Sequence, residues 1–281
     1  MVTLKKETEI QGNGLMKNKP CTVKFVPSKT GKIRYFVKDS EPFDANVDNV
    51  ISTQSCVVLG NKKSSVMLVE HLSAALAFCG IDSLDIHVSE EELPILDGSA
   101  KEWVELFKEA GIEKPILEKK RHYIVNEPIY YLNGKTSLVI LPADELRITY
   151  AVNYDHPDLK GKWVSYTPLA KGGWRAGATG GLQQEIIEAR TFGFYKDLKK
   201  FHALGLARGV SIANTVGLTD NGYTTELRSQ NEPIKHKILD LIGDLYLTGV
   251  NPLNLKAQIL VKEAGHAVHV KVARELKGKL I

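Results

Sequence analysis

Apolar and polar side chains alternate in several short stretches of the chain, as they do in strands that bury one face. The alternation is clear from Cys21 to Phe25 and again from Leu84 to Val88. Residues 136–141, 145–152 and 255–262 are rich in valine, isoleucine and leucine, of which the β-branched types are frequent in strands. The pattern therefore predicts β-strands in both halves of the chain.

Elsewhere apolar side chains recur every three or four residues, which is typical of amphipathic helices. Ser99 and Glu102 form a capping box that predicts the start of one helix. Pro233 suits the first turn of another, and glycine directly follows three of these stretches, as is common at helix C-termini. The predicted helices span residues 66–79, 99–110, 183–189 and 233–248.

Strands and helices follow one another in mixed order, which favours an α+β fold over a regular series of β-α-β units. The segment from Glu113 to Arg121 is charged, contains proline and follows a predicted helix. We therefore expect a boundary there between a first domain, residues 1–115, and a second, residues 122–281. Residues 170–181 hold five glycines and predict a flexible loop that would suit an active-site flap.

The composition is that of a globular protein. Of 281 residues, 43% are hydrophobic and 25% charged, which allows a sizeable core. The N-terminus lacks the apolar core of a signal peptide, and no stretch approaches the roughly 20 apolar residues of a membrane span. The three cysteines, Cys21, Cys56 and Cys79, are odd in number and widely spaced, which is a poor disulfide framework. We therefore expect a cytoplasmic protein without a transmembrane segment.

Net charge and motifs limit the classes of partner. The formal charge of +4 is too small to indicate nucleic-acid binding. The chain has neither a G-x-G-x-x-G sequence nor a P-loop, so no motif predicts a site for a cofactor phosphate. The pattern carries no signal for an oligomeric state.

The predicted helix 233–248 carries a stripe of ionisable side chains. His236, Asp240 and Asp244 recur one turn apart, on the side opposite the isoleucines and leucines. A histidine and an aspartate one turn apart can chelate a single metal ion. A solvated polar face explains the same spacing, so the stripe alone does not decide between the two interpretations.

Two other groups of ionisable residues stand out. Glu70 and His71 lie in an otherwise apolar helix, where burying a carboxylate costs several kcal/mol unless it has a partner. In metallohydrolases a histidine can hold the metal while a glutamate accepts a proton from water. An exposed helix edge is the alternative, and the H-E-x-x-H sequence is absent. His266 and His269, after a predicted strand and a turn, could be ligands, general acids or surface histidines.

Five blocks of sequence occur in order along nearly the whole chain. They are Val69-Glu-His-Leu-Ser-Ala-Ala-Leu76, Leu93-Pro-Ile-Leu-Asp-Gly-Ser-Ala100, Ala189-Arg-Thr-Phe-Gly-Phe194, His236-Lys-Ile-Leu-Asp-Leu-Ile-Gly-Asp-Leu245 and Gly265-His-Ala267. Together these blocks resemble the UDP-3-O-acyl-N-acetylglucosamine deacetylases, the zinc amidases of lipid A biosynthesis. The resemblance implies two similar α+β domains, each a small β-sheet packed on a pair of helices, in a layered sandwich with the active site between them.

The resemblance also implies a metal ion and a set of catalytic groups. Zinc would be bound by His71, His236 and Asp240, with water in the remaining position, and Fe²⁺ could occupy the same ligands. Glu70 would be the general base, and His266 the proton donor to the leaving amine. Asp244 would orient His266 and favour its charged form, and Thr191 would help to hold the oxyanion.

The implied substrate is UDP-3-O-acyl-N-acetylglucosamine, and the products are the free amine and acetate. Lys237 would contact anionic or polar groups of the sugar nucleotide, and Phe192 would pack on the sugar. An apolar passage formed by an insert in the second domain, around residues 195–215, would receive the acyl chain. Its expected lining residues are Leu198, Phe201, Leu204 and Leu206.

The chain departs from the family pattern at the rim of the expected site. The family's Gly-Ile/Leu-His-Ser/Thr-Gly loop is Gly14-Leu-Met-Lys-Asn18 here, so Met16 stands in place of the histidine. Two alternatives to an active deacetylase follow. One is a non-catalytic paralogue that binds a sugar nucleotide or lipid precursor, and the other is a metalloamidase for another N-acetylated sugar. Further departures lie at Leu68, Gly209-Val-Ser211, Glu226-Leu-Arg-Ser229 and the long stretch 170–181.

Overall fold

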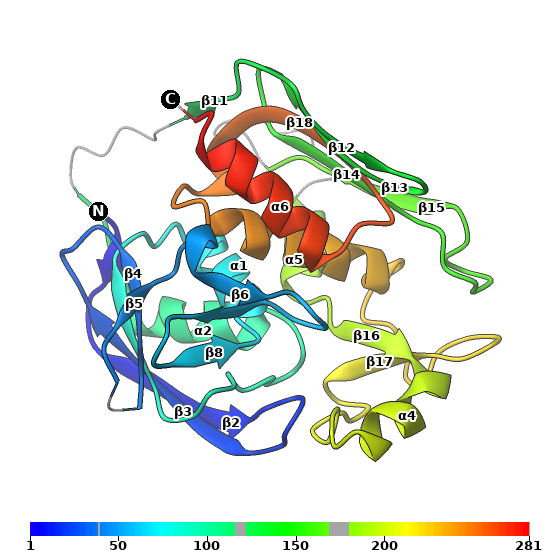
Figure 1. Ribbon diagram of the computed structural model, residues 1–281, viewed down its shortest axis with the longest axis horizontal. Helices are drawn as coiled ribbons and strands as arrows, with labels where there is room; N and C mark the ends of the chain where they lie inside the picture. The colour runs from blue at the N-terminus through cyan, green and yellow to red at the C-terminus, as the bar shows by residue number, and fades with distance from the viewer. Residues whose placement is uncertain (39, 116–121, 169–179, 281) are drawn as a thin grey trace.

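The fold is α+β, as the sequence predicts, with helices between two β-sheets (Figure 1). A computed structural model describes residues 1–38, 40–115, 122–168 and 180–280. Helices α1 (Glu70–Cys79) and α5 (Glu232–Tyr246) lie at the centre and contact each other. Helix α2 (Lys101–Ala110) packs on α1, and α6 (His266–Lys277) packs on α5.

The first sheet is built by the N-terminal part of the chain. Its strand order is β2-β3-β9-β4-β5, in which the β4–β9 pair is parallel and the other pairs are antiparallel. Phe25 on β3 makes edge-to-face contacts with Trp103 and Phe107 of α2, at centroid distances of 5.9 and 5.0 Å. These contacts hold α2 against one face of the sheet. The strands are β2 (Thr8–Asn13), β3 (Pro20–Pro27), β4 (Ile33–Val37), β5 (Phe43–Asp44) and β9 (Leu84–Val88).

The second sheet comes from later residues, in the order β12-β13-β18-β14-β15, and β11 pairs in parallel with β18. Ile259 of β18 pairs with Ile140 of β13 and with Ile148 of β14, and all three side chains are buried. Helices α5 and α6 contact this sheet, so its inner face is covered by helices. The strands are β11 (Tyr123–Ile124), β12 (Ile129–Asn133), β13 (Thr136–Pro142), β14 (Arg147–Val152), β15 (Lys162–Tyr166) and β18 (Leu255–Lys262).

Shorter elements complete the fold around these layers. Strands β6, β7 and β8 form a small antiparallel sheet, β1 pairs with β10, and β16 pairs in parallel with β17. These elements are β1 (Thr3–Leu4), β6 (Val50–Ser52), β7 (Val58–Gly60), β8 (Ser65–Met67), β10 (Ile112–Glu113), α3 (Gly180–Ile187), β16 (Thr191–Phe194), α4 (Leu198–Ala203) and β17 (Thr215–Leu218), with short 3₁₀ helices at Val47–Asn49, Tyr195–Asp197 and Pro252–Asn254.

The predicted strands and helices occur, but some helix ends are wrong. The strands are β3, β9, β13, β14 and β18, and the helices are α1, α2, α3 and α5. The predicted start of α1 at residue 66 is wrong, because residues 65–67 pair with β7 and Leu68 has a φ of +68°. The predicted capping box does not form. Instead, Ser99 Oγ donates to the Asp97 carboxylate at 2.8 Å and accepts from the Lys101 N–H at 3.1 Å.

Helices α4 and α6 have no counterpart among the predicted ones. The domain boundary expected at 113–121 stays a prediction, since residues 116–121 lie outside the described residues, as does most of the glycine-rich stretch 170–181. The three cysteines are buried and free. Among the helices that the structure describes, none combines the length and apolar character needed to cross a bilayer.

Helices α1 and α5 approach each other closely at Gly243. A Cβ atom at this position would lie 2.1 Å from the carbonyl oxygen of Glu70. Any side chain at residue 243 would therefore push the backbone of α1 away from α5. Because α1 also carries His71, this contact sets the distance between the ionisable residues of the two helices.

We expect Gly243→Ala to lower the free energy of unfolding by about 1–3 kcal/mol through overpacking, although alanine has the higher helix propensity. Urea denaturation would measure the change. Gly278→Ala is the matched control, because a Cβ atom there meets its nearest neighbour, the Glu275 carbonyl oxygen, at 3.6 Å. If both variants were as stable as the wild type, the close approach of α1 and α5 would be contradicted.

Candidate active site

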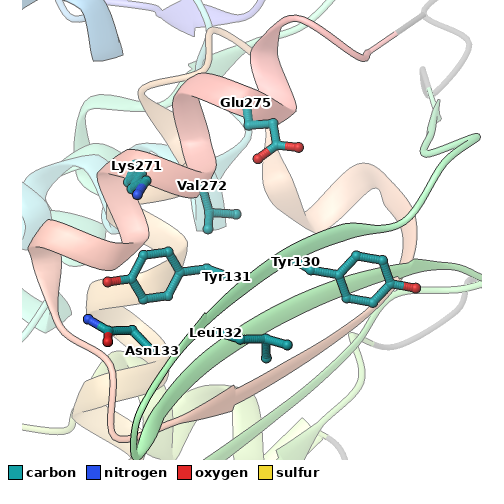
Figure 2. A pocket seen from close by; sticks show the side chains of 7 residues that line it. All are labelled: Tyr130, Tyr131, Leu132, Asn133, Lys271, Val272 and Glu275. Carbon is teal, nitrogen blue, oxygen red and sulfur yellow. The ribbon is translucent and has the colours of Figure 1, made fainter.

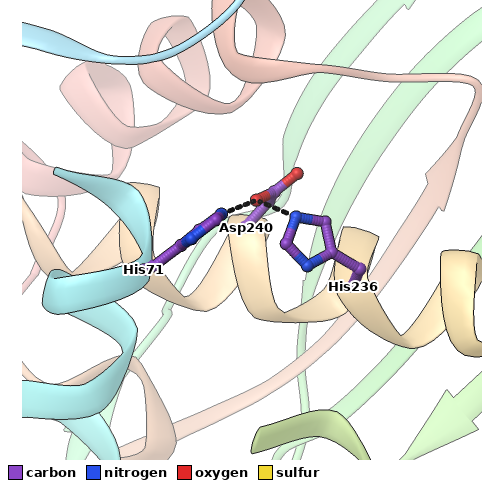
Figure 3. Close-up of side chains that lie close together, drawn as sticks. All are labelled: His71, His236 and Asp240. Atoms are coloured by element: carbon purple, nitrogen blue, oxygen red, sulfur yellow. Dashed lines mark ion pairs between the residues drawn. The ribbon is translucent and has the colours of Figure 1, made fainter. Parts of the chain in front are cut away.

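Three side chains converge where α1 passes α5 (Figure 3). His71 projects from the first turn of α1, and His236 and Asp240 lie one turn apart on α5. Asp240 Oδ1 lies 3.3 Å from His236 Nε2 and 3.9 Å from His71 Nε2. The two imidazole rings meet edge to face, with centroids 4.9 Å apart. All three side chains are buried, so the solvated-face interpretation of this stripe on α5 is wrong.

These three residues fit a divalent metal ion. One ligand atom from each lies within 4.8 Å of the others, and ligands of a tetrahedral zinc ion are about 3.3 Å apart. Asp240 Oδ1 is buried and has no hydrogen-bond partner among the described residues. An unpartnered buried carboxylate oxygen is costly, and a cation between it and the two imidazole nitrogens would remove that cost. Three protein ligands are the usual number in catalytic zinc sites.

The tautomers and charges of these groups suit metal binding. His236 Nδ1 lies 2.9 Å from the Ala189 carbonyl oxygen, which can only accept, so Nδ1 carries the proton and the Nε2 lone pair is free. Burial lowers the pKa of His236. Burial and then the neighbouring His236 lower the pKa of His71 to about 3, although Asp240 acts in the opposite direction. Both imidazoles are therefore neutral, as metal ligands must be.

Lys237 fixes the second oxygen of Asp240. Its Nζ donates to Asp240 Oδ2 at 2.8 Å, and both side chains are buried. Burial alone would raise the pKa of Asp240, but the positive charge of Lys237, followed by the neighbouring His236, outweighs it and holds that pKa well below its usual value. Burial would likewise lower the pKa of Lys237, yet Asp240 holds it above its usual value. Asp240 is thus ionised, with Oδ1 free.

A buried ion pair positions the Ala189 carbonyl that holds His236. The Glu232 carboxylate, at 0% exposure, accepts from the Arg190 N–H and Nε, both at 2.9 Å, and from the Arg228 N–H at 2.7 Å. These bonds connect Glu232, at the start of α5, to Arg190. Because Arg190 directly follows Ala189, they also fix the position of the Ala189 carbonyl. No local pattern signals the pair, because its members lie far apart in the sequence.

Glu232→Ala should lower the free energy of unfolding of the metal-free protein by about 3–5 kcal/mol, because it leaves the Arg190 guanidinium buried and unpaired. Chemical denaturation of the metal-free protein would measure it. Glu226→Ala is the control, since the side chain of Glu226 is exposed and only its carbonyl accepts from Arg190. Equal stability of the two variants would show that the Arg190–Glu232 pair does not hold this segment.

Glu70 lies beside the three metal-site residues and is buried. Its Oε2 accepts from the Val57 N–H at 3.1 Å, and its Oε1 lies 3.6 Å from His266 Nε2. Burial is the main reason why the pKa of Glu70 is raised to about 7; His266 acts in the opposite direction, and Asp244 and Asp240 contribute to the rise. A base whose pKa lies near neutrality suits general-base catalysis.

His266, the first residue of α6, faces Glu70. Its Nδ1 donates to Asp244 Oδ2 at 2.8 Å, which leaves Nε2 directed toward Glu70 and Asp240. Burial alone would lower the pKa of His266, but the carboxylates of Asp244, Asp240 and Glu70 outweigh it and raise the pKa to about 9. At neutral pH His266 therefore carries a proton on Nε2 that it can donate.

Thr191 and Phe192 follow the Ala189 carbonyl on β16. The Thr191 N–H donates to the Gly98 carbonyl oxygen at 2.8 Å, and the Phe192 ring centroid lies 6.1 Å from that of His236. The structure thus brings the residues proposed for metal binding, catalysis and substrate binding to one region. Their individual roles stay predictions.

Of the interpretations that the sequence leaves open for His269, the surface position is wrong. His269 is fully buried on α6, and its Nδ1 lies 2.8 Å from Asp244 Oδ2, the oxygen that His266 also contacts. The distances from Asp244 Oδ2 to the two Nδ1 atoms are hydrogen-bond lengths. They are shorter than the separation of two ligand atoms around one zinc ion, so these side chains are hydrogen-bonded to one another rather than arranged as metal ligands. The spacing of three residues from His266 indicates this placement only once α6 is known to be a helix.

The loop that carries Met16 contacts the segment expected to receive an acyl chain. The Met16 and Lys17 N–H groups donate to the buried Glu92 carboxylate at 2.5 and 3.0 Å. The Met16 carbonyl oxygen accepts from the Arg208 N–H at 3.1 Å. In that segment Leu204 is 66% and Phe201 37% exposed. The apolar side chains of residues 195–215 are therefore only partly covered by the rest of the protein.

A separate hollow of about 330 Å³ lies between β12 and α6 (Figure 2). Lys271 from α6 lies over the Tyr131 ring there, with Nζ 4.9 Å from the ring centroid. None of the ionisable residues around α1 and α5 lines it. The hollow belongs to the packing of α6 on the second sheet rather than to the site above.

Comparison with known proteins gives one consistent result. The profile of a family described as "LpxC: UDP-3-O-acyl N-acetylglycosamine deacetylase" matches residues 1–278. The UDP-3-O-acyl-N-acetylglucosamine deacetylase of Leptospira biflexa is 36% identical over 279 residues, covering 97% of this chain and 88% of the relative. The protein of the same name from a Nostoc species is 34% identical over 271 residues and 94% of both chains. That from Histophilus somni is 35% identical over 287 residues, covering 98% of this chain and 88% of the relative.

Proposed function

Because the chain belongs to the family of UDP-3-O-acyl-N-acetylglucosamine deacetylases, we propose that it is a zinc-dependent amide hydrolase of lipid A biosynthesis. It removes the N-acetyl group of UDP-3-O-acyl-N-acetylglucosamine and releases the free amine and acetate. The reaction takes place in the cytoplasm. Fe²⁺ is a second metal that suits a set of two histidines and one aspartate.

One observation supports this proposal most directly. Two neutral imidazole nitrogens converge beside Glu70 and His266 with a carboxylate oxygen that has no hydrogen-bond partner in the described part of the chain. A metal held by His71, His236 and Asp240 accounts for that oxygen. It would polarise the amide carbonyl and make water a better nucleophile at neutral pH.

The residues around this metal position would share the proton transfers. Glu70 accepts a proton from the attacking water molecule while the oxygen of that water bonds to the acetyl carbon. His266 donates the proton on Nε2 to the amide nitrogen as the carbon–nitrogen bond breaks, so that the sugar leaves as a neutral amine. Thr191 stabilises the negative charge that develops on the carbonyl oxygen.

Substrate binding would involve the groups around this centre. Lys237 contacts anionic or polar groups of the sugar nucleotide, and Phe192 packs on the sugar. Residues 195–215, with Leu198, Phe201, Leu204 and Leu206, receive the acyl chain. The partly exposed apolar side chains of this segment support that assignment.

Acetate release from the UDP-sugar substrate, measured together with the metal content of the same sample, tests this proposal. We expect one zinc ion per active site and acetate release that a chelator abolishes and zinc restores. Folded, metal-free protein that releases no acetate with or without added zinc would overturn it.

Met16 favours a second function, a non-catalytic paralogue that binds a sugar nucleotide or lipid precursor. Such a protein would bind the UDP-sugar without turnover. A panel of N-acetylated sugars that differ in nucleotide and acyl chain also distinguishes a metalloamidase of different specificity. If the UDP group had no effect on the rate, that third function would be favoured.

A further inference from the structure

His269 is a buried polar residue that the proposed mechanism does not use. It lies one turn along α6 from His266 and has 0% exposure. Its Nδ1 lies 2.8 Å from Asp244 Oδ2, and its Nε2 lies 3.0 Å from the Tyr150 hydroxyl on β14. Both ring nitrogens therefore have partners, as a buried imidazole requires.

The hydrogen bonds around His269 define one tautomer. Burial lowers the pKa of His269, although Asp244 opposes this, so the ring is neutral and carries one proton. The Asp244 carboxylate can only accept, which places that proton on Nδ1. The Tyr150 hydroxyl donates to the Ala264 carbonyl oxygen at 2.7 Å, and its oxygen lies 3.0 Å from His269 Nε2.

Asp244 depends on His269 because it has few other partners. Its carboxylate is fully buried, and Oδ1 has no hydrogen-bond partner among the described residues. Oδ2 accepts from the Nδ1 atoms of both His266 and His269 at 2.8 Å. Without His269, His266 would be the remaining side-chain donor to Asp244 among the described residues, and a residue that orients another must itself be fixed.

We infer that His269 is a positioning residue for proton donation: through its Nδ1–H it fixes Asp244, and Asp244 in turn fixes the imidazole of His266. The inference rests on the proposed function, in which His266 protonates the leaving amine. The side-chain hydrogen-bond partners of His269 among the described residues are Asp244 and Tyr150, and neither is a proposed metal ligand. The Tyr150 hydroxyl lies 3.0 Å from the other ring nitrogen, Nε2, and helps to hold the His269 ring in place.

Three substitutions of His269 test the inference, because they differ in whether they offer Asp244 an N–H donor near the position of Nδ1. His269→Asn offers an amide N–H close to the position of Nδ1, His269→Gln places its amide near the position of Nε2 instead, and His269→Leu offers neither. The amide variants are matched in polarity, so a general cost of changing a buried side chain affects both. Steady-state kcat and KM for the UDP-sugar would be measured per bound zinc.

We expect His269→Leu and His269→Gln to lower kcat by about tenfold or more, a part of the roughly 10²–10⁴ that a general acid contributes, with KM and zinc content close to wild type. His269→Asn should restore most of kcat. If the role of His269 were only structural, the variants would yield less folded, zinc-loaded protein. They would not lower kcat selectively over KM, and the Asn and Gln variants would behave alike.

Two results would overturn the inference while leaving the proposed function intact. In the first, the wild type is active and all three variants match it per zinc site. In the second, Asn and Gln lose kcat to the same extent. A wild type that releases no acetate would instead refute the proposed function, so the two failures are distinguishable.

Discussion

His71→Ala is expected to abolish metal-dependent activity while the protein stays folded. The substitution removes one of three ligands, and metal catalysis is worth several kcal/mol of transition-state stabilisation, or about a thousandfold in rate. His71 is neutral and has no hydrogen-bond partner among the described residues apart from its approach to Asp240. Its loss therefore leaves no new buried donor or acceptor unsatisfied, and the metal-free variant should fold.

Thermal unfolding with and without zinc measures the same loss independently of activity. A ligand at 100 times its Kd stabilises the folded state by about 2.7 kcal/mol, so zinc should raise the Tm of the wild type and leave that of His71→Ala nearly unchanged. His87→Ala is the control, because His87 is an exposed histidine on β9 stacked on Phe36. If His71→Ala kept the zinc-dependent shift in Tm, the assigned ligand set would be wrong.

The sequence indicated which ionisable residues belong to this site, but it did not indicate how they are brought together. The spacing of His236 and Asp240 on one helix and the adjacency of Glu70 and His71 are local, so they are visible without a structure. Their meeting is not local. It depends on the contact of Gly243 with α1 and on the buried pair of Arg190 with Glu232, which no periodic pattern records.

Helix α6 was not predicted, and its sequence shows why local patterns leave part of the fold unpredicted. Val268, Val270 and Val272 alternate with other residues, a spacing typical of a strand, and valine is a weak helix former. In the folded protein Val270 and Val272 are buried where α6 packs on the second sheet, and this tertiary packing outweighs local preference. Because the helix was not predicted, the buried position of His269 was not predicted either. His266 and His269 come to lie on the same side only when the segment is a helix.

The two proton-transfer residues should respond in opposite ways to pH. Glu70 must be ionised to accept a proton, and its pKa is raised to about 7, so the rate should rise as pH increases through that pKa. His266 must be protonated to donate, and its pKa is raised to about 9, so the rate should fall as pH passes it. A bound divalent cation favours the forms without the proton and shifts both limbs toward lower pH. The expected profile of kcat/KM is a bell.

Glu70→Gln and His266→Gln should each lower kcat/KM by about 10²–10⁴, and they should do so at opposite ends of this bell. Glu70→Gln keeps the side-chain volume and the zinc ligands, so zinc content should match wild type while the acidic limb disappears. His266→Gln should remove the alkaline limb instead. Each variant is the control for the other, because both replace a buried ionisable group beside the same metal position. If the two gave the same pH profile, the base could not be assigned to Glu70 and the acid to His266. If Glu70→Gln kept full turnover, Glu70 would not be the base, and water would have to lose its proton to another group in the site.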